Sequence, residues 1–123
     1  MTVLVVDDDP IVIASCRKVL LAEGLAVQAT MSVPEAVQWL RQEHHDLLLV
    51  DLKMPEYDGL HLMRIAREDH PELPILVMSG FPTPDTVARC AEAGATGFVP
   101  KPFTPRELLD AVRHAAAGRA DTG

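Results

Sequence analysis

The chain carries five short apolar runs, and a longer stretch with amphipathic spacing follows each of them. The runs occupy residues 3–6, 25–30, 47–50, 74–78 and 97–100, and the second is the least regular. The continuous apolar runs at 3–6, 47–50 and 74–78, bounded by polar residues, predict strands that are buried on both faces. The run at 25–30 alternates only in part and predicts a weaker strand, and the run at 97–100 predicts a short last strand. Between the runs, apolar residues recur at spacings of three and four, which predicts helices with one buried face.

Capping residues mark where the predicted helices begin and end. The candidate N-caps are Asp9, Ser32, Thr83 or Asp85, and Thr104. Gly24 and Gly94 follow the last periodic residues of two helices, where a glycine commonly ends a helix. The resulting order is strand then helix, repeated five times with short connections. It predicts an α/β fold, a doubly wound five-stranded parallel sheet with helices on both faces.

Length and charge narrow the class of protein. A chain of 123 residues suits one domain, and we expect it to span residues 1–118. Residues 119–123 have no apolar anchor and are expected to form a frayed tail or the start of a linker. The formal net charge is -7 and no basic cluster is present, which argues against direct binding of nucleic acid.

The cysteines and the apolar runs bear on the cellular compartment. Cys16 and Cys90 lie far apart on predicted helices and form no metal-binding or disulfide motif, so we expect buried reduced thiols. The first apolar run is short and is broken by acidic residues, unlike a signal peptide. No run approaches the length of a membrane span. These features predict a cytoplasmic protein with no membrane segment.

Polar residues follow four of the five predicted strands. Asp7 and Asp8 follow the first strand, Asp51 the third, Ser79 the fourth and Lys101 the fifth. The carboxyl ends of parallel strands lie at one edge of the sheet, where open α/β sheets bind ligands. We therefore expect three carboxylates, one hydroxyl and one ammonium group to converge there.

Such a constellation suits phosphoryl chemistry. Clustered carboxylates repel one another unless a cation neutralises them, and Mg²⁺ with oxygen ligands is the usual cation where phosphate is involved. An aspartate can attack phosphorus to form an acyl phosphate. Mg²⁺ and the Lys101 ammonium would then supply positive charge to the phosphoryl oxygens, and the Ser79 hydroxyl would supply a hydrogen-bond donor.

The motifs that contain these residues resemble those of a known family. They are Asp7-Asp8, Asp51-Leu52-Lys53-Met54-Pro55 with Asp58-Gly59, Ser79-Gly80 and Lys101-Pro102-Phe103. In this order, on successive strand ends, they resemble the CheY-like receiver domains of response regulators in two-component phosphorelay signalling. The resemblance covers essentially the whole chain and implies a flavodoxin-like sheet with the strand order 2-1-3-4-5.

The resemblance also implies a role for each site residue. Asp51 would be the phosphoacceptor, and Ser79 and Lys101 would bind the phosphoryl oxygens. The Mg²⁺ ligands would be Asp8, Asp51 and the backbone carbonyl of Lys53, together with Asp7 acting mainly through a metal-bound water. The family further implies a cis peptide bond between Lys101 and Pro102.

Switching and partners follow from the same resemblance. On phosphorylation, Ser79 would turn toward the phosphoryl group and Phe98 would rotate inward, remodelling the face of the fourth helix, fifth strand and fifth helix. The partners implied are a histidine kinase or histidine phosphotransfer protein, and a downstream effector or output domain; a homodimer on activation is a further expectation. The domain would be a signalling module that catalyses only its own phosphorylation and dephosphorylation.

Two other functions remain open on the sequence. A haloacid-dehalogenase-like phosphatase would use Asp7 as nucleophile and Asp9 as general acid, with Ser79 and Lys101 as later motifs, but it leaves the Asp51 motif unexplained. The second alternative is an interaction domain of the same architecture that is never phosphorylated. For Asp9 itself, a helix N-cap is the preferred interpretation. We expect the adjacent His44 and His45 to lie at a solvated helix end.

Overall fold

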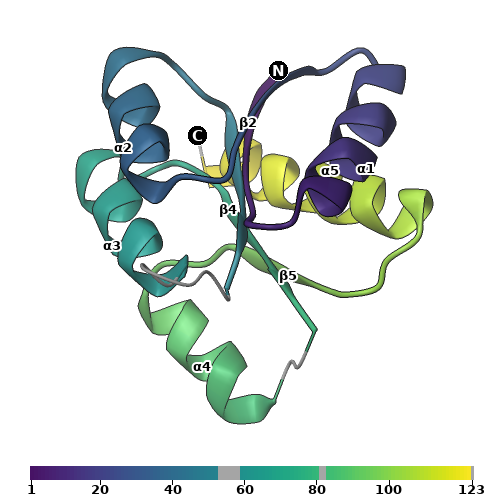
Figure 1. Cartoon of the computed structure of the whole chain (residues 1–123). Coiled ribbons are helices and arrows are strands. Elements are labelled where there is room, and N and C mark those ends of the chain that lie inside the picture. The colour runs from purple at the N-terminus through teal and green to yellow at the C-terminus, as the bar shows by residue number, and fades with distance from the viewer. Residues whose placement is uncertain (53–58, 81–82, 123) are drawn as a thin grey trace.

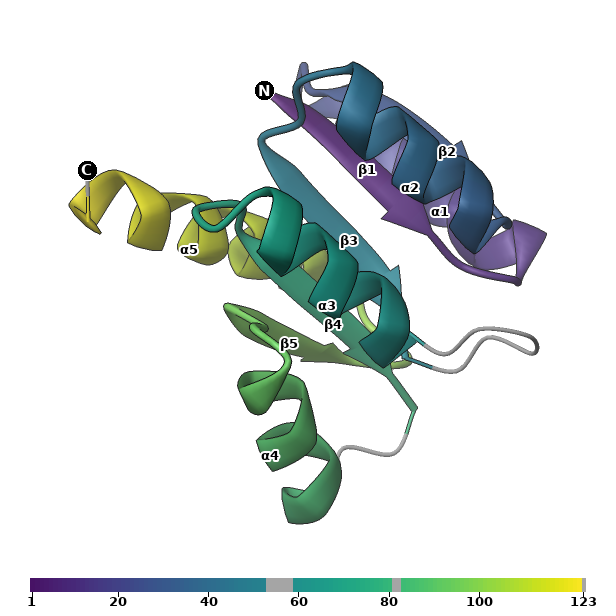
Figure 2. The same ribbon diagram turned by 90° about the vertical axis from the view of Figure 1, so that its left-hand side faces the viewer.

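A computed structural model describes residues 1–52, 59–80 and 83–122, and the side chains as far as residue 117. Its five parallel strands form one sheet that has helices on both sides (Figure 1). The strand order β2-β1-β3-β4-β5, which can be followed in Figure 2, confirms the predicted fold class and strand order. The strands are β1 (Thr2–Val6), β2 (Ala26–Thr30), β3 (Leu47–Asp51), β4 (Ile75–Ser79) and β5 (Gly97–Pro100). The helices are α1 (Pro10–Ala22), α2 (Val33–Gln42), α3 (Gly59–Asp69), α4 (Pro84–Glu92) and α5 (Pro105–Thr122).

Two hydrophobic cores lie on opposite faces of the sheet. Leu48 and Val50 of β3 pack with residues of α2 and α3, whereas Leu47 and Leu49 pack with residues of α1 and α5. Every residue of β3 is buried, because helices cover both faces of this central strand. The continuous apolar run in the sequence is the direct consequence of this double burial.

The parallel register brings the carboxyl ends of four strands to one edge. Val6 of β1 lies opposite Val50 of β3, and Asp51 lies opposite Met78 of β4. Ser79 in turn lies opposite Pro100 of β5. The residue that ends or follows each strand therefore reaches the same side of the molecule, as the sequence predicts.

The predicted N-caps are confirmed at four helices. A side-chain oxygen accepts a backbone hydrogen bond from the first turn at Asp9, Ser32, Thr83 and Thr104. Thr83, rather than Asp85, therefore caps α4. At α5 the Glu107 carboxylate also accepts a hydrogen bond of 3.0 Å from the Thr104 backbone N–H, which completes a capping box. The spacing of Thr104 and Glu107 carries this signal in the sequence.

The C-terminal end of the chain, the cysteines and the helices bear on three further expectations. Helix α5 runs to Thr122, and the division into a domain of residues 1–118 and a tail of residues 119–123 stays a prediction. Cys16 and Cys90 are both free and buried, as expected. Among the helices of the described residues, none has the length and apolar character needed to cross a membrane.

The expectation that His44 and His45 are both solvated is wrong for His45. The His44 side chain is exposed, but His45 is only 5% exposed, because the chain turns there from α2 into β3. The His45 Nε2 atom pairs with the side-chain oxygen of Gln28 on β2, and the Gln28 amide donates a 2.8 Å hydrogen bond to Glu43. Burial lowers the pKa of His45, and the neighbouring Glu43 carboxylate only partly opposes this effect.

We expect His45 to make the stability of the domain dependent on pH. Its pKa in the folded state lies below the usual 6.5, so below that pH the unfolded state binds more protons. The free energy of unfolding should therefore fall as the pH drops below about 6.5, by at most about 1.4 kcal/mol per pH unit for this one group. Urea denaturation from pH 7.5 to 5 should show a smaller slope for His45→Gln. A His45→Gln slope equal to that of the wild type would contradict this assignment.

Candidate functional site

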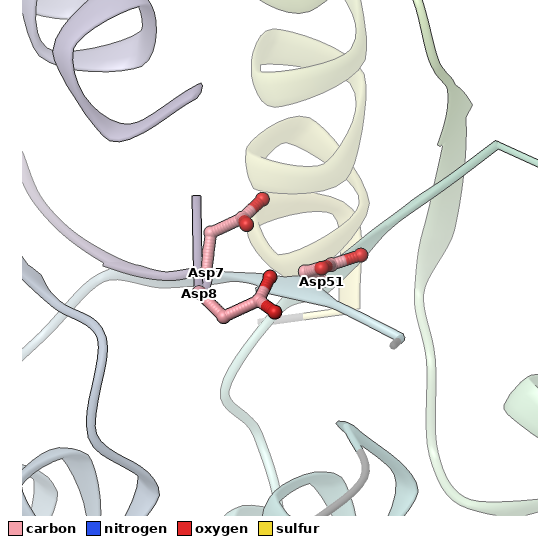
Figure 3. Close-up of side chains that lie close together, drawn as sticks. All are labelled: Asp7, Asp8 and Asp51. Carbon is pink, nitrogen blue, oxygen red and sulfur yellow. The ribbon is translucent and has the colours of Figure 1, made fainter. Parts of the chain in front are cut away.

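Three carboxylates gather at the carboxyl edge of the sheet. Asp7 and Asp8 follow β1 and Asp51 ends β3, and each offers an oxygen within 4.8 Å of the others (Figure 3). The sequence predicted this convergence from the strand ends alone. The three groups have different surroundings, since Asp7 is fully buried, Asp51 is 5% exposed and Asp8 is exposed. Solvent therefore reaches the cluster on the side of Asp8.

Asp7 is held in place from two sides. Its Oδ1 atom accepts a 2.8 Å hydrogen bond from the backbone N–H of Asp9, and its Oδ2 atom lies 2.9 Å from the Lys101 Nζ atom. The backbone N–H of Asp7 donates to the carbonyl of Thr30 at the end of β2. A buried carboxylate needs such partners, because burying an uncompensated charge is costly.

Lys101 joins the two buried carboxylates. Its Nζ atom lies 2.9 Å from Asp7 and 3.4 Å from the Oδ1 atom of Asp51. Burial by itself would lower the pKa of Lys101, but the hydrogen bond and charge of Asp7, and then those of Asp51, outweigh burial and raise it. The ammonium group therefore stays charged at neutral pH, between two carboxylates. The Lys101–Pro102 peptide bond is cis, as the resemblance implied.

Ser79 and Phe98 lie where the sequence placed them. Ser79 ends β4, is 2% exposed, and its carbonyl accepts a 2.7 Å hydrogen bond from the Lys101 backbone N–H. This bond ties the ends of β4 and β5 together at the site. Phe98 is half-buried on β5, opposite Val77, and packs against the core that contains α2 and α3. Lys53, the remaining predicted ligand, lies outside the described residues.

Gly59 supports the site in a way that sequence reasoning missed. The backbone N–H of Gly59 donates a 3.0 Å hydrogen bond to the carbonyl of Leu52, so α3 begins directly beside the end of β3. A Cβ atom at residue 59 would overlap the carbonyl oxygen of Asp51 and lie 3.0 Å from the Cα atom of Leu52. Gly59 is part of a motif that resembles the family's, but only the structure reveals this close approach.

Asp9, the third of the consecutive acidic residues after β1, is not part of the carboxylate cluster. Its Oδ1 atom accepts a 2.8 Å hydrogen bond from the backbone N–H of Ile11, and it caps α1 from an exposed position. The preferred interpretation of Asp9 as an N-cap is therefore confirmed. A general acid paired with an Asp7 nucleophile would have to leave this cap.

The donor set of the cluster fits a hard divalent cation. Three carboxylates surround one small space, and a single ammonium group, that of Lys101, compensates part of their charge among the described residues. Oxygen ligands from carboxylates suit Mg²⁺, which retains several water molecules when it binds to proteins. The exposed side of the cluster, at Asp8, would let such waters reach the cation from solvent.

Cys16 lies in the core close to Asp7. Burial first, and then the charge of Asp7, raise the pKa of this thiol to about 12, although Lys101 partly opposes them. At neutral pH the thiol is therefore uncharged and has little nucleophilic character. Cys16 acts as a packing residue beneath the site, in line with the expectation of a buried reduced thiol.

Comparison with known proteins agrees with this geometry. Residues 3–113 match the family model described as the response regulator receiver domain. The chain is 36% identical over 113 residues to the response regulator MprA of Mycobacterium avium, covering 92% of this chain and 50% of that protein. It is 33% identical over 113 residues to the DNA-binding transcriptional regulator NtrC of Proteus hauseri, covering 92% of this chain and 24% of that protein.

Solved structures give the same result. The crystal structure of a CheY-like receiver domain protein from Methanospirillum hungatei superimposes with a TM-score of 0.93 at 26% identity, covering 99% of this chain and 98% of that one. The chemotaxis protein CheY4 of Vibrio cholerae superimposes with a TM-score of 0.90 at 26% identity, covering 93% of this chain and 97% of that one.

Response regulator receiver domains are typically signalling domains rather than classical enzymes, and the doubly wound sheet with its acidic cluster and lysine is consistent with that class. The chain belongs to the response regulator receiver domain family. It spans half or less of the length of the two relatives described above.

Proposed function

We propose that Asp51 accepts a phosphoryl group from a phosphohistidine of a histidine kinase or histidine phosphotransfer protein. The observation that carries this proposal is the position of Lys101 Nζ between the carboxylates of Asp7 and Asp51, beside a cluster that is open at Asp8. A carboxylate oxygen of Asp51 attacks phosphorus, the bond from phosphorus to the histidine nitrogen breaks, and the imidazole leaves. The product is an acyl phosphate.

Asp51 suits the role of nucleophile better than its two neighbours. Asp7 is fully buried, and both of its oxygens are engaged, by the Asp9 N–H and by Lys101. Asp8 is exposed, so its carboxylate can bind a cation but is surrounded by fewer ordered groups that could bind phosphoryl oxygens. Asp51 combines a nearly buried position with a charged lysine 3.4 Å away, which would bind the oxygens of an incoming phosphoryl group.

Mg²⁺ is the proposed cofactor, held by Asp8, Asp51 and the backbone carbonyl of Lys53, with Asp7 contributing mainly through a bound water. When bound, the ion would neutralise the carboxylates and the developing charge on the phosphoryl oxygens. Lys101 and the Ser79 hydroxyl would hold the same oxygens from the opposite side.

The proposed output is the face formed by α4, β5 and α5. Phosphorylation adds a doubly charged group beside Ser79, whose hydroxyl would turn toward it and let Phe98 move inward. This change would alter the surface that meets an effector or output domain, or a second copy of the chain. The matched region is only 24% of the DNA-binding regulator NtrC of Proteus hauseri. That an output domain accompanies the present chain is therefore part of the proposal, and its identity is left open. A cytoplasmic location is proposed on the basis of the two free thiols.

Intact mass spectrometry after incubation with acetyl phosphate tests this function. With Mg²⁺ present we expect one added phosphoryl group that hydroxylamine removes, as it does from acyl phosphates. Chelation of Mg²⁺ should reduce the adduct by at least about tenfold, because the carboxylates then repel the incoming phosphate.

A rapid loss of the phosphoryl group could hide the adduct, so the binding of beryllium fluoride with Mg²⁺ serves as the second measurement. A chain that shows neither an adduct nor Mg²⁺-dependent beryllium fluoride binding would contradict the proposal. An adduct that is unaffected by chelation would contradict the role of the metal.

A further inference from the structure

Helix α4 is attached to the domain mainly through its C-terminal end. It buries one residue, Cys90, whereas α3 buries five. Ala93, just beyond α4, is also buried, and both residues belong to the core that contains α2 and α3. Val87, in the first half of α4, is 41% exposed. Figure 2 shows α4 near β5, apart from α2 and α3, in agreement with this limited packing.

Arg67 connects the C-terminal end of α4 to α3. It lies in the last turn of α3, and its Nη2 atom donates a 2.7 Å hydrogen bond to the carbonyl of Gly94, two residues beyond α4. Its Nη1 atom donates to the carbonyls of Pro71, at 2.5 Å, and His70, at 3.3 Å. One guanidinium group therefore joins the segment after α3 to the segment after α4. We call this set of contacts the Arg67 clasp.

The backbone of Gly94 is shaped to receive this side chain. Gly94 has a φ of +105°, and a Cβ atom there would lie 2.7 Å from the Nε atom of Arg67. The arginine side chain thus lies directly against the backbone that ends α4. Burial lowers the pKa of Arg67, because the charged guanidinium loses contact with water. A planar fork of donors can serve several carbonyls at once, which a lysine ammonium on a flexible stem does less well.

The middle of α4, ahead of its clasped end, borders open space. A cavity of about 160 Å³ lies between α4 and the start of α3, and it is lined by Leu52, Leu60, Thr86 and Arg89. Leu52 directly follows Asp51 in the chain, so one wall of this cavity is built from the segment after β3. Val87 is exposed and α4 borders a cavity ahead of its clasped end, so the helix can shift by pivoting about that end.

We propose that Arg67 is a positioning residue that fixes the C-terminal end of α4 as a pivot. Movement of α4 in response to phosphorylation at Asp51 is then confined to its N-terminal half, around Thr86 and Val87. This inference rests on the proposed function, because it concerns how the face of α4, β5 and α5 responds to the phosphoryl group. It assigns the two ends of α4 different tasks: one changes position, and the other keeps it docked.

Amide hydrogen exchange resolved by residue tests the pivot. The N–H groups of Gly94 and Ala95 report on the clasped end, because they donate to Ala91 and Cys90, and the N–H of Val87, which donates to Thr83, reports on the other end. In the wild type, addition of Mg²⁺ and beryllium fluoride should change the exchange rate at Val87. The exchange rates at Gly94 and Ala95 should stay within about twofold of their values without beryllium fluoride.

The decisive variant is Arg67→Gln, with Arg64→Gln as a matched control. Arg64 is an exposed arginine on the same helix, so its replacement removes the same charge and leaves the clasp intact. In Arg67→Gln we expect exchange at Gly94 and Ala95 to rise at least about tenfold relative to α1, and to respond to beryllium fluoride. Arg67→Lys keeps the charge and much of the aliphatic side chain. Its exchange rates at Gly94 and Ala95 should lie between those of the wild type and of Arg67→Gln.

Three outcomes of the exchange measurements would overturn the inference while the proposed function stands. In Arg67→Gln, unchanged exchange at Gly94 and Ala95 would show that the clasp does not hold α4. A uniform rise across all helices would show a general loss of stability instead of a local pivot. In the wild type, equal responses at Val87 and Gly94 would show that α4 moves as a whole. If the wild type forms no adduct and binds no beryllium fluoride, the proposed function fails, and the pivot fails with it.

Discussion

Replacement of Asp51 with asparagine is expected to abolish covalent phosphorylation. The asparagine amide matches the carboxyl group in size, but its oxygen is a poor nucleophile and carries no charge for a cation. With acetyl phosphate and Mg²⁺, the rate of adduct formation should fall at least about a hundredfold, since the covalent step loses its attacking group. Intact mass spectrometry measures the adduct, and a thermal unfolding curve checks that Asp51→Asn remains folded.

Asp9→Asn is the matched control and also addresses the phosphatase alternative. Asparagine is a good N-cap, so this variant keeps the cap of α1 and removes one acidic group next to the site. A receiver domain should still be phosphorylated when Asp9 is replaced. An adduct that survives Asp51→Asn but disappears in Asp7→Asn would contradict the proposed function and favour an Asp7 nucleophile.

The strands and the convergence of the site could be predicted from the sequence because both depend on short-range patterns. A strand covered by helices on both faces must be apolar throughout, and β3 and β4 are buried at every residue. Once five parallel strands alternate with helices, the topology brings their carboxyl ends to one edge. The positions of Asp7, Asp51 and Lys101 follow from that rule and need no detailed coordinates.

Features that depend on tertiary contacts could not be predicted from the sequence. His45 is buried because the path from α2 into β3 carries it over Gln28 of β2, and adjacent histidines give no sign of this. The choice of Asp7 and Asp51 as partners of Lys101, with Asp8 left at the rim, depends on side-chain directions at two strand ends. The Arg67 clasp likewise joins segments that are 27 residues apart.

The Gly59→Ala substitution is expected to destabilise the domain and disturb Asp51 together. The new Cβ atom would overlap the Asp51 carbonyl oxygen and lie 3.0 Å from the Cα atom of Leu52, and backbone atoms cannot turn aside as a flexible side chain can. Overpacking of this kind costs about 1–3 kcal/mol, so urea denaturation should show a free energy of unfolding lower by about 2 kcal/mol. The end of β3 must shift to relieve the contact, and the rate of phosphorylation should fall with it.

Gly80→Ala separates this steric effect from the general effect of replacing a glycine. Gly80 follows Ser79 at the same edge of the sheet, but a Cβ atom there would meet nothing within 4 Å. Alanine restricts the backbone of the unfolded chain more than glycine does. The free energy of unfolding of Gly80→Ala should therefore equal that of the wild type or exceed it by up to about 1 kcal/mol. Equal losses of stability in both variants would mean that the approach of α3 to Asp51 is not the cause. A loss confined to Gly59→Ala would mean that the start of α3 holds the end of β3, and with it the Asp51 carboxylate, in position.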